Sequence, residues 1–222
     1  MITSTNTSKS YLLKLSIPFL IANMAIPFVG LVDTALMGHL SNEKFLAAIS
    51  IATSVVTMIL WSFGFLRMST VGLVSQALGS KNHNEAILIL VRNIILASFI
   101  GIIIIFFKGS IISLIELFFE TSEETQNLIK KYISIRILSA PAELLIFVLA
   151  GFYLGMQKTY ISSLIISIFC FSNAILSSIL VVRYDLEIFG VAAGTAITAY
   201  ITVIIFLIFS YFQIKNNFKI SL

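Results

Sequence analysis

The chain has 222 residues, of which 59% are hydrophobic and only 11% are charged, and its formal net charge is +4 at neutral pH. Its mean hydropathy is +1.05. This composition excludes a soluble globular domain, because uncharged stretches close to the roughly 20 residues that a helix needs to cross hydrocarbon recur along the whole chain. We therefore predict an all-α, polytopic membrane protein.

Six transmembrane helices are predicted after a polar N-terminal segment, residues 1–14. The predicted spans are Leu15–Met37, Phe45–Leu66, Ala86–Phe107, Tyr132–Met156, Tyr160–Val182 and Ile188–Phe212. The second helix is expected to continue toward Gly79, and residues 110–131 are expected to form an interfacial helical linker. Residues 213–222 form a basic tail. The first apolar run is too long for a cleaved signal peptide and lacks a cleavage site, so it is predicted to be a retained span.

Basic residues orient these spans. Six spans place both termini on one side, and that side carries more lysine and arginine than the other, which favours cytoplasmic termini. The residues on the side of the termini are Lys9, Lys14, Lys81, Arg92, Lys158, Lys215 and Lys219, against Lys44, Lys108, Lys130, Lys131 and Arg183. Because the positive charge is scattered over loops that face anionic lipid, it requires no nucleic-acid partner, and none is predicted.

One aspartate, Asp33, lies in the outer third of the first span. A charged carboxylate at the centre of a bilayer costs about 3 kcal/mol on insertion scales, so a chain that keeps one there usually uses it for protons or cations. From its position alone two interpretations stay open: a cation-handling site within the membrane, or a residue near enough to the interface to be hydrated.

Other features of the spans concern bending and polar contacts. Pro18 and Pro27 each remove a helical hydrogen bond and permit a bend in the first span. Arg136 and Glu143 lie seven residues apart in the fourth span, and we predict a structural ion pair between them. Asn173, midway along the fifth span, needs either an interhelical hydrogen bond or a ligand.

Small residues predict that the helices pack closely. Gly151 and Gly155, and again Gly190 and Gly194, have the Gly-x-x-x-Gly spacing that lets two helix backbones approach each other. The single cysteine, Cys170, lies in the middle of a span and is expected to be a small packing residue. These features indicate a compact helical bundle.

No pattern of catalytic residues is present. The chain lacks His-Glu-x-x-His, Gly-x-Ser-x-Gly, a phosphate-binding glycine loop and a cysteine cluster, so we predict that it is not an enzyme. Its two histidines, His39 and His83, fall in opposite loops, which argues against a metal site. No cofactor is expected, and any transport would be driven by a proton or sodium gradient.

Several segments resemble the multidrug and toxic compound extrusion (MATE) family, in the right order along the chain. They are Ser16-Ile-Pro18, Asp33-Thr-Ala-Leu-Met-Gly-His-Leu40, Phe65-Leu-Arg-Met-Ser-Thr-Val-Gly72-Leu-Val-Ser-Gln76-Ala-Leu-Gly79, Ile135-Arg-Ile-Leu-Ser-Ala-Pro141-Ala142 and Gly190-Val-Ala-Ala-Gly-Thr-Ala-Ile-Thr198. The Phe-Leu-Arg-Met stretch is similar to the DinF-like branch. The resemblance covers the amino-terminal six-helix lobe of the family.

The resemblance implies an antiporter of the bacterial inner membrane that exports amphipathic or cationic compounds in exchange for protons or sodium ions. The substrate would lie in a cavity between two six-helix lobes. Asp33 matches the family's cation-coupling aspartate and Pro18 its bending proline. Tyr132, Asn173 and Thr198 match positions that line the cavity.

Two departures from the family leave alternatives open. Relatives commonly have an aspartate where this chain has Ser177, which leaves Asp33 without its usual acidic partner; a lone carboxylate fits a proton better than sodium. Family members also have twelve helices. The chain is thus one subunit of a split transporter, a homodimer, or a truncated or regulatory membrane subunit without transport activity. A lipid-precursor flippase is a further alternative, disfavoured because few basic residues lie within the spans. The sequence does not identify the substrate.

Overall fold

A computed structural model describes residues 43–119 and 121–218, together with seven isolated residues of the first predicted span. Those seven residues are all helical: Ile17, Leu20, Met24, Val32, Ala35, Leu36 and Gly38. Every regular element in the described part is a helix. The helices are α2 (Glu43–Ser62), α3 (Phe65–Gly79), α4 (His83–Phe106), α5 (Lys108–Phe118), α6 (Glu123–Arg136), the 3₁₀ turn η1 (Ile137–Ser139), α7 (Ala140–Gly155), α8 (Thr159–Val182) and α9 (Glu187–Phe218).

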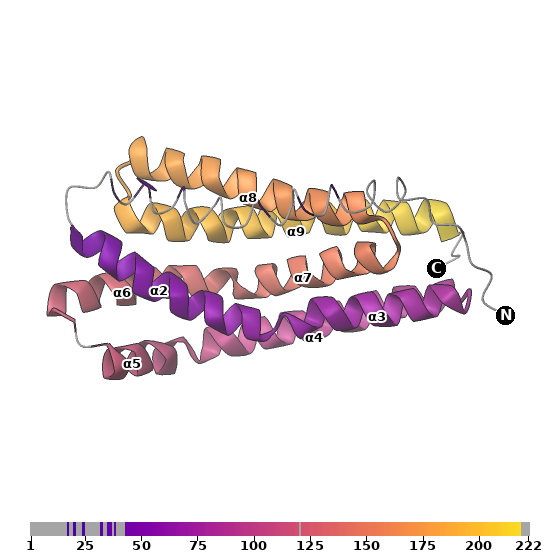
Figure 1. Ribbon diagram of the computed structural model, residues 1–222, viewed down its shortest axis with the longest axis horizontal. Coiled ribbons are helices and arrows are strands. Elements are labelled where there is room, and N and C mark those ends of the chain that lie inside the picture. Colours follow the sequence, from indigo (N-terminus) through magenta and orange to yellow (C-terminus); the bar gives the residue numbers. More distant parts are fainter. Residues whose placement is uncertain are drawn as a thin grey trace.

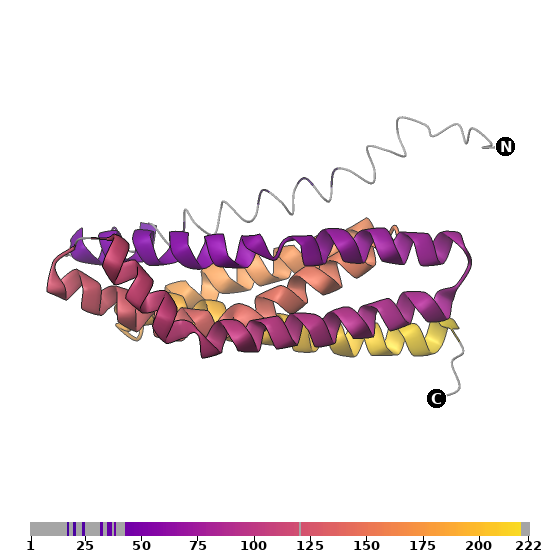
Figure 2. The same ribbon diagram turned by 90° about the horizontal axis from the view of Figure 1, so that it is seen from below.

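Within this part of the chain, five helical segments are long and apolar enough to cross a membrane. They are Leu46–Gly79, His83–Phe106, Glu123–Gly155, Thr159–Val182 and Glu187–Lys215. They lie lengthwise in one elongated bundle (Figures 1 and 2). These segments correspond to the second through sixth predicted spans. The first predicted span, apart from the seven residues above, and the N-terminal segment 1–14 lie outside the described residues.

Helix α7 is the centre of the bundle. It packs against α3 and α4 on one side and against α8 and α9 on the other, as its middle position in Figure 1 shows. In the segment Glu123–Gly155, which contains α7, 78% of an 18-residue apolar stretch is buried inside the protein. The corresponding share is 28% in Leu46–Gly79, which contains α2 and α3, and 28% in α4. Burial of this size explains why α7 is almost uniformly apolar, since a helix that is covered all round needs no polar face.

The second helix continues beyond the predicted end of its span, as expected from the sequence. It breaks only at Phe63–Gly64, where Gly64 N–H donates to the Trp61 carbonyl at 2.9 Å, and α3 then runs to Gly79. The chain turns back through Lys81, whose φ is 58°. Asn82 begins the next helix, because its side chain accepts a hydrogen bond from Glu85 N–H at 3.0 Å.

An interfacial linker was predicted over residues 110–131, and its C-terminal boundary is wrong. The structure has the separate helix α5, but α6 already begins at Glu123 and continues through η1 into α7 as one 33-residue segment. Ser122 caps α6 by accepting a hydrogen bond from Thr125 N–H. Two acidic residues in the first turn, Glu123 and Glu124, stabilise that end of the helix dipole. Local capping therefore starts the helix well before its sequence becomes apolar.

Both Gly-x-x-x-Gly motifs lie at close helix contacts, which confirms their predicted role. A β-carbon on Gly151 would lie 2.7 Å from the carbonyl oxygen of Arg67, and one on Gly155 would lie 2.9 Å from that of Val71, so α7 lies directly against α3. Gly194 is equally close to Ser177 of α8. Side chains at these positions would separate the helices.

The single cysteine occupies an interior position, as the sequence predicts. Cys170 lies on α8 and is only 4% exposed, in a small apolar cluster with Ala150 and Ile166. It therefore acts as a packing residue.

Candidate functional site

A cluster of buried polar side chains lies where α8 packs against α9. Asn173 of α8 is 1% exposed, and its Nδ2 donates a hydrogen bond to Thr195 Oγ1 of α9 at 2.8 Å. The Thr195 hydroxyl in turn donates to the Val191 carbonyl at 3.0 Å. Of the two alternatives for Asn173, an interhelical hydrogen bond is therefore present.

Two oxygen atoms of this cluster are buried with no hydrogen-bond partner in the described part of the chain: Asn173 Oδ1 and Ser177 Oγ. They lie one helical turn apart on α8, and Gly194 allows the backbone of α9 to approach Ser177 closely. An unpaired buried polar atom costs about 1–3 kcal/mol, so such atoms need an explanation. The arrangement presents oxygen atoms that can accept a hydrogen bond or contact a cation.

The other predicted cavity residues are also buried in the bundle. Thr198 of α9 is 3% exposed, and its hydroxyl donates to the Gly194 carbonyl at 2.7 Å. Tyr132 of α6 is 1% exposed, and its hydroxyl lies 3.1 Å from Thr53 Oγ1 of α2. The structure thus links Asn173 to α9 and Tyr132 to α2.

Thr195 was missed by the sequence analysis, which selected Thr198 one turn later. The signal that could have found it is the motif formed by Gly190 and Gly194. Such glycines mark the helix face that touches a neighbouring helix, and Thr195 follows the second of them directly.

A second polar network, at the junction of α6 and α7, confirms the predicted pair of Arg136 and Glu143. Arg136 Nη2 donates to Glu143 Oε2 at 3.2 Å, and Arg136 Nη1 contacts Oε1 as well. Ser139 Oγ also donates to Glu143 Oε1, at 2.6 Å. The network spans η1, at the middle of the 33-residue segment, where Tyr200 of α9 donates to the Leu138 carbonyl at 3.0 Å.

The three remaining predicted site residues, Asp33, Pro18 and Pro27, lie outside the described residues. Within the residues that are described, no group of three or more His, Cys, Asp or Glu side chains is placed to hold a metal ion.

The exposed faces of the helices differ in chemistry. After the first two residues of α4, its exposed residues are apolar apart from Arg92: Leu88, Val91, Ile95, Leu96, Phe99, Ile102, Ile103 and Phe106. The exposed surface of α2–α3 also carries large apolar side chains, among them Met58, Trp61 and Met68. It differs from α4 in seven exposed hydroxyl or amide side chains, which we call the hydroxyl face: Ser50, Ser54, Thr57, Ser62, Ser69, Ser75 and Gln76. Acyl chains suit the first face, whereas the second suits a protein surface or a wet cavity.

The family model described as MatE matches residues 18–180. The chain belongs to the MatE family. Among curated proteins, it is 33% identical over 199 residues to DNA damage-inducible protein F of Escherichia coli strain K12, covering 90% of this chain and 43% of that protein. It is also 30% identical over 207 residues to multidrug export protein MepA of Staphylococcus haemolyticus, covering 91% of this chain and 44% of MepA.

Solved structures show the same fold. A structure described as the outward-facing conformation of a multidrug resistance MATE family transporter matches with a TM-score of 0.80 at 21% identity, covering 87% of this chain and 43% of that chain. A MATE structure in complex with MaD3S matches with a TM-score of 0.81 at 20% identity.

These matches establish an integral, multi-pass membrane protein with the fold of a MATE lobe. MATE proteins are transporters, which agrees with the prediction that the chain is not an enzyme. The chain spans less than half the length of the relatives it matches.

Proposed function

We propose that this chain forms one lobe of a secondary active antiporter that exports amphipathic or cationic compounds in exchange for protons or sodium ions. The observation that carries the proposal is the family match over residues 18–180, together with relatives whose names describe multidrug export. The proposed location is the bacterial inner membrane, with both termini in the cytoplasm.

In this proposal Asp33 couples the cation to the substrate. Its carboxylate lies within an apolar run, and it matches the family's coupling aspartate. Pro18 and Pro27 would let the first span bend as the cation enters or leaves. A proton is the preferred ion, because Ser177 supplies no second carboxylate.

Tyr132, Asn173 and Thr198 are the candidate cavity residues. The unpaired Asn173 Oδ1 supports this role, since a buried amide oxygen without a partner in the described part of the bundle is available to a ligand or a cation. Thr195 would then orient the Asn173 amide through its hydrogen bond.

A second six-helix lobe, from another polypeptide or from a second copy of this chain, would complete the cavity. The hydroxyl face of α2–α3 supports this part of the proposal. Its serine and threonine side chains are small, which lets another helix approach at these positions. A two-lobe cavity between α2–α3 and its counterpart would also place these hydroxyls beside the substrate.

The test is efflux of a fluorescent lipophilic cation from cells that express the chain, with and without Asp33→Asn, at equal protein levels. We expect Asp33→Asn to abolish gradient-driven efflux. The matched control is Asp185→Asn, which removes an exposed carboxylate in the turn between α8 and α9 and should leave efflux unchanged. Equal efflux by wild type and Asp33→Asn would remove the coupling role.

The need for a second lobe is tested separately. If the wild-type chain gives no efflux above empty cells, it is not a self-sufficient transporter, and co-purification with a second six-helix chain becomes the decisive measurement. A partner that restores efflux would support the split transporter. Stable protein without efflux, alone or with such partners, would instead favour a membrane subunit without transport activity.

A further inference from the structure

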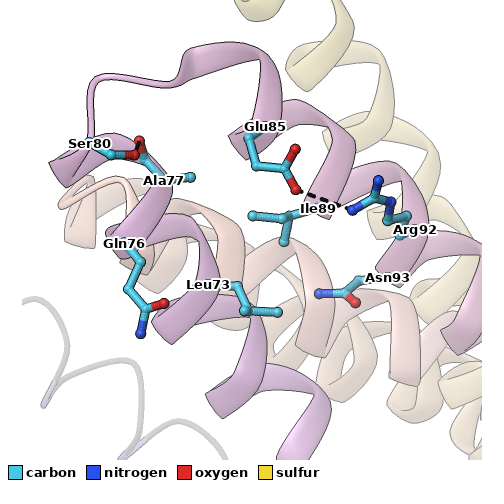
Figure 3. Close-up of a pocket in the computed structure, with 8 residues that line it drawn as sticks. All are labelled: Leu73, Gln76, Ala77, Ser80, Glu85, Ile89, Arg92 and Asn93. Carbon is cyan, nitrogen blue, oxygen red and sulfur yellow. Dashed lines mark hydrogen bonds and ion pairs between the residues drawn. The ribbon is translucent and has the colours of Figure 1, made fainter.

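A groove lies between α3 and α4 at the end of the bundle where the two helices join (Figure 3). Its volume is about 310 Å³, and the residues that line it include Leu73, Gln76 and Ala77 on α3 and Glu85, Ile89 and Arg92 on α4. Apart from Gln76, which also belongs to the hydroxyl face, no residue used in the proposed function lines this groove. It is therefore distinct from the α8–α9 cluster.

Arg92 is a charged residue on an otherwise apolar part of the α4 surface. The helix is 24 residues long, or about 36 Å, which exceeds the roughly 30 Å of the hydrocarbon core by little. Arg92 lies nine residues after His83, so its backbone is about 14 Å along the helix axis. Its exposed neighbours along that face, Leu88, Val91 and Ile95, are apolar. An arginine at this depth must send its guanidinium toward the head groups.

The guanidinium follows that direction, since it points back along α4 toward the turn (Figure 3). Arg92 Nη1 lies 3.1 Å from Glu85 Oε1, and the two side chains are 63% and 42% exposed. Guanidinium has five N–H donors, and in the described part of the chain this is the one polar contact of Arg92. Both charged groups therefore keep free hydrogen-bonding positions at the mouth of the groove.

The rest of the lining is mixed. Leu73, Ala77 and Ile89 supply its apolar part, and Gln76, Ser80 and Asn93 are polar. The Gln76 amide points away from Arg92 and Glu85 (Figure 3). The groove thus places one cation and one anion beside apolar side chains, near the turn that joins α3 and α4.

We propose that this groove binds a phospholipid head group that carries both a phosphate and a primary ammonium, as phosphatidylethanolamine does. The phosphate would accept hydrogen bonds from Arg92, and the ammonium would donate to Glu85. The apolar side chains of Leu73, Ala77 and Ile89 would contact the glycerol and the first acyl carbons. Glu85 sets the selectivity, because it repels a head group with only negative charge and cannot accept a hydrogen bond from a methylated ammonium.

The test measures lipid retention by the purified full-length chain using native mass spectrometry. Phosphatidylethanolamine, phosphatidylcholine and phosphatidylglycerol with identical acyl chains are titrated in turn. We expect phosphatidylethanolamine to bind up to about fivefold more tightly than the other two, because an exposed ion pair contributes no more than that to affinity. Equal retention of all three lipids by the wild-type chain would overturn the proposal.

Substitutions at Arg92 and Glu85 test the role of each charge in lipid binding separately. Arg92→Gln should weaken retention of phosphatidylethanolamine about tenfold, the loss expected for hydrogen bonds to a charged group. Glu85→Gln should keep the phosphate contact but lose the preference over phosphatidylglycerol. Arg183→Gln is the matched control, because it removes an exposed arginine at the C-terminal end of α8, at the other end of the bundle.

Circular dichroism of each variant checks that the helices are intact, so that a loss of binding is not a loss of fold. If Arg92→Gln and Arg183→Gln weaken retention equally, the groove has no specific role and the proposal fails. It also fails if Glu85→Gln leaves the lipid preference unchanged. Neither result bears on efflux through Asp33, so this proposal and the proposed function are tested independently.

Discussion

Two arginine–glutamate pairs with the same spacing lie in different surroundings. Glu85 and Arg92 are seven residues apart on α4, and so are Arg136 and Glu143 across the junction of α6 and α7. The first pair has one contact at 3.1 Å and side chains 42% and 63% exposed. The second has contacts to both carboxylate oxygens, a further hydrogen bond from Ser139, and side chains only 10% and 13% exposed.

Spacing alone therefore brings the charges together, and burial decides what the contact does. Seven residues are about two helical turns, so each pair shares one helix face. On the exposed surface of α4 the surroundings screen the charges, and the pair remains free to bind something else. At η1 the bundle covers both charges, and each compensates the other.

The largest expected effect comes from breaking the buried pair. Glu143→Gln removes the carboxylate that pairs with the buried Arg136 guanidinium, and this should lower the free energy of unfolding by about 3–5 kcal/mol. Titration of the reconstituted protein with a denaturing detergent measures the change. The control is the double variant Arg136→Met with Glu143→Leu, which removes both charges and should recover most of the loss. A single variant as stable as wild type would mean that the pair is not buried as described.

A smaller effect is expected from the packing beside that pair. In Gly101→Ala, the new β-carbon would lie 2.4 Å from Cα of Pro141, so α4 and α7 must move apart at a cost of about 1–3 kcal/mol. Gly72→Ala is the matched control, because nothing lies within 4 Å of its added β-carbon, and alanine is the better helix former by about 1 kcal/mol. The same detergent titration compares the two. Equal stability of the two variants would contradict the tight contact of α4 with α7.

The smallest effect is expected at the exposed pair. Glu85→Gln and Arg92→Gln should each change the free energy of unfolding by less than about 1 kcal/mol, because an exposed ion pair contributes little. The measurement is made without added lipid, so that lipid binding does not contribute. A loss as large as that of Glu143→Gln would show that the two pairs are equivalent and that the contrast between them is wrong.

Much of the fold could be predicted from local sequence. Long apolar runs located the second through sixth spans, and the Gly-x-x-x-Gly spacing located the contacts at Gly151 and Gly194. The start of α6 at Glu123 was missed, because hydropathy falls where Lys130 and Lys131 occur although the helix continues. The capping residue Ser122 marks the start of α6, but a single capping residue predicts a helix start less strongly than a 20-residue apolar run predicts a span.

The candidate site was less accessible to prediction. Arg136 and Glu143 could be paired from spacing within one helix, whereas the partner of Asn173 lies 22 residues away on another helix. Which threonine of α9 meets Asn173 depends on the relative rotation of α8 and α9. That rotation is fixed by the packing of Gly190 and Gly194 against α8, which the sequence does not specify in atomic detail.

Cys170, buried between α7 and α8, has a practical consequence. A chain whose one thiol is shielded from reagents behaves almost as a cysteine-free background, so a cysteine introduced at Ser54 or Ser69 can be alkylated selectively. Modification rates at these two positions would map which stretch of α2–α3 faces water, which faces lipid and which is covered by a partner. Because Cys170 is buried, the accessibility of each position of the hydroxyl face can be measured by alkylation in an intact membrane.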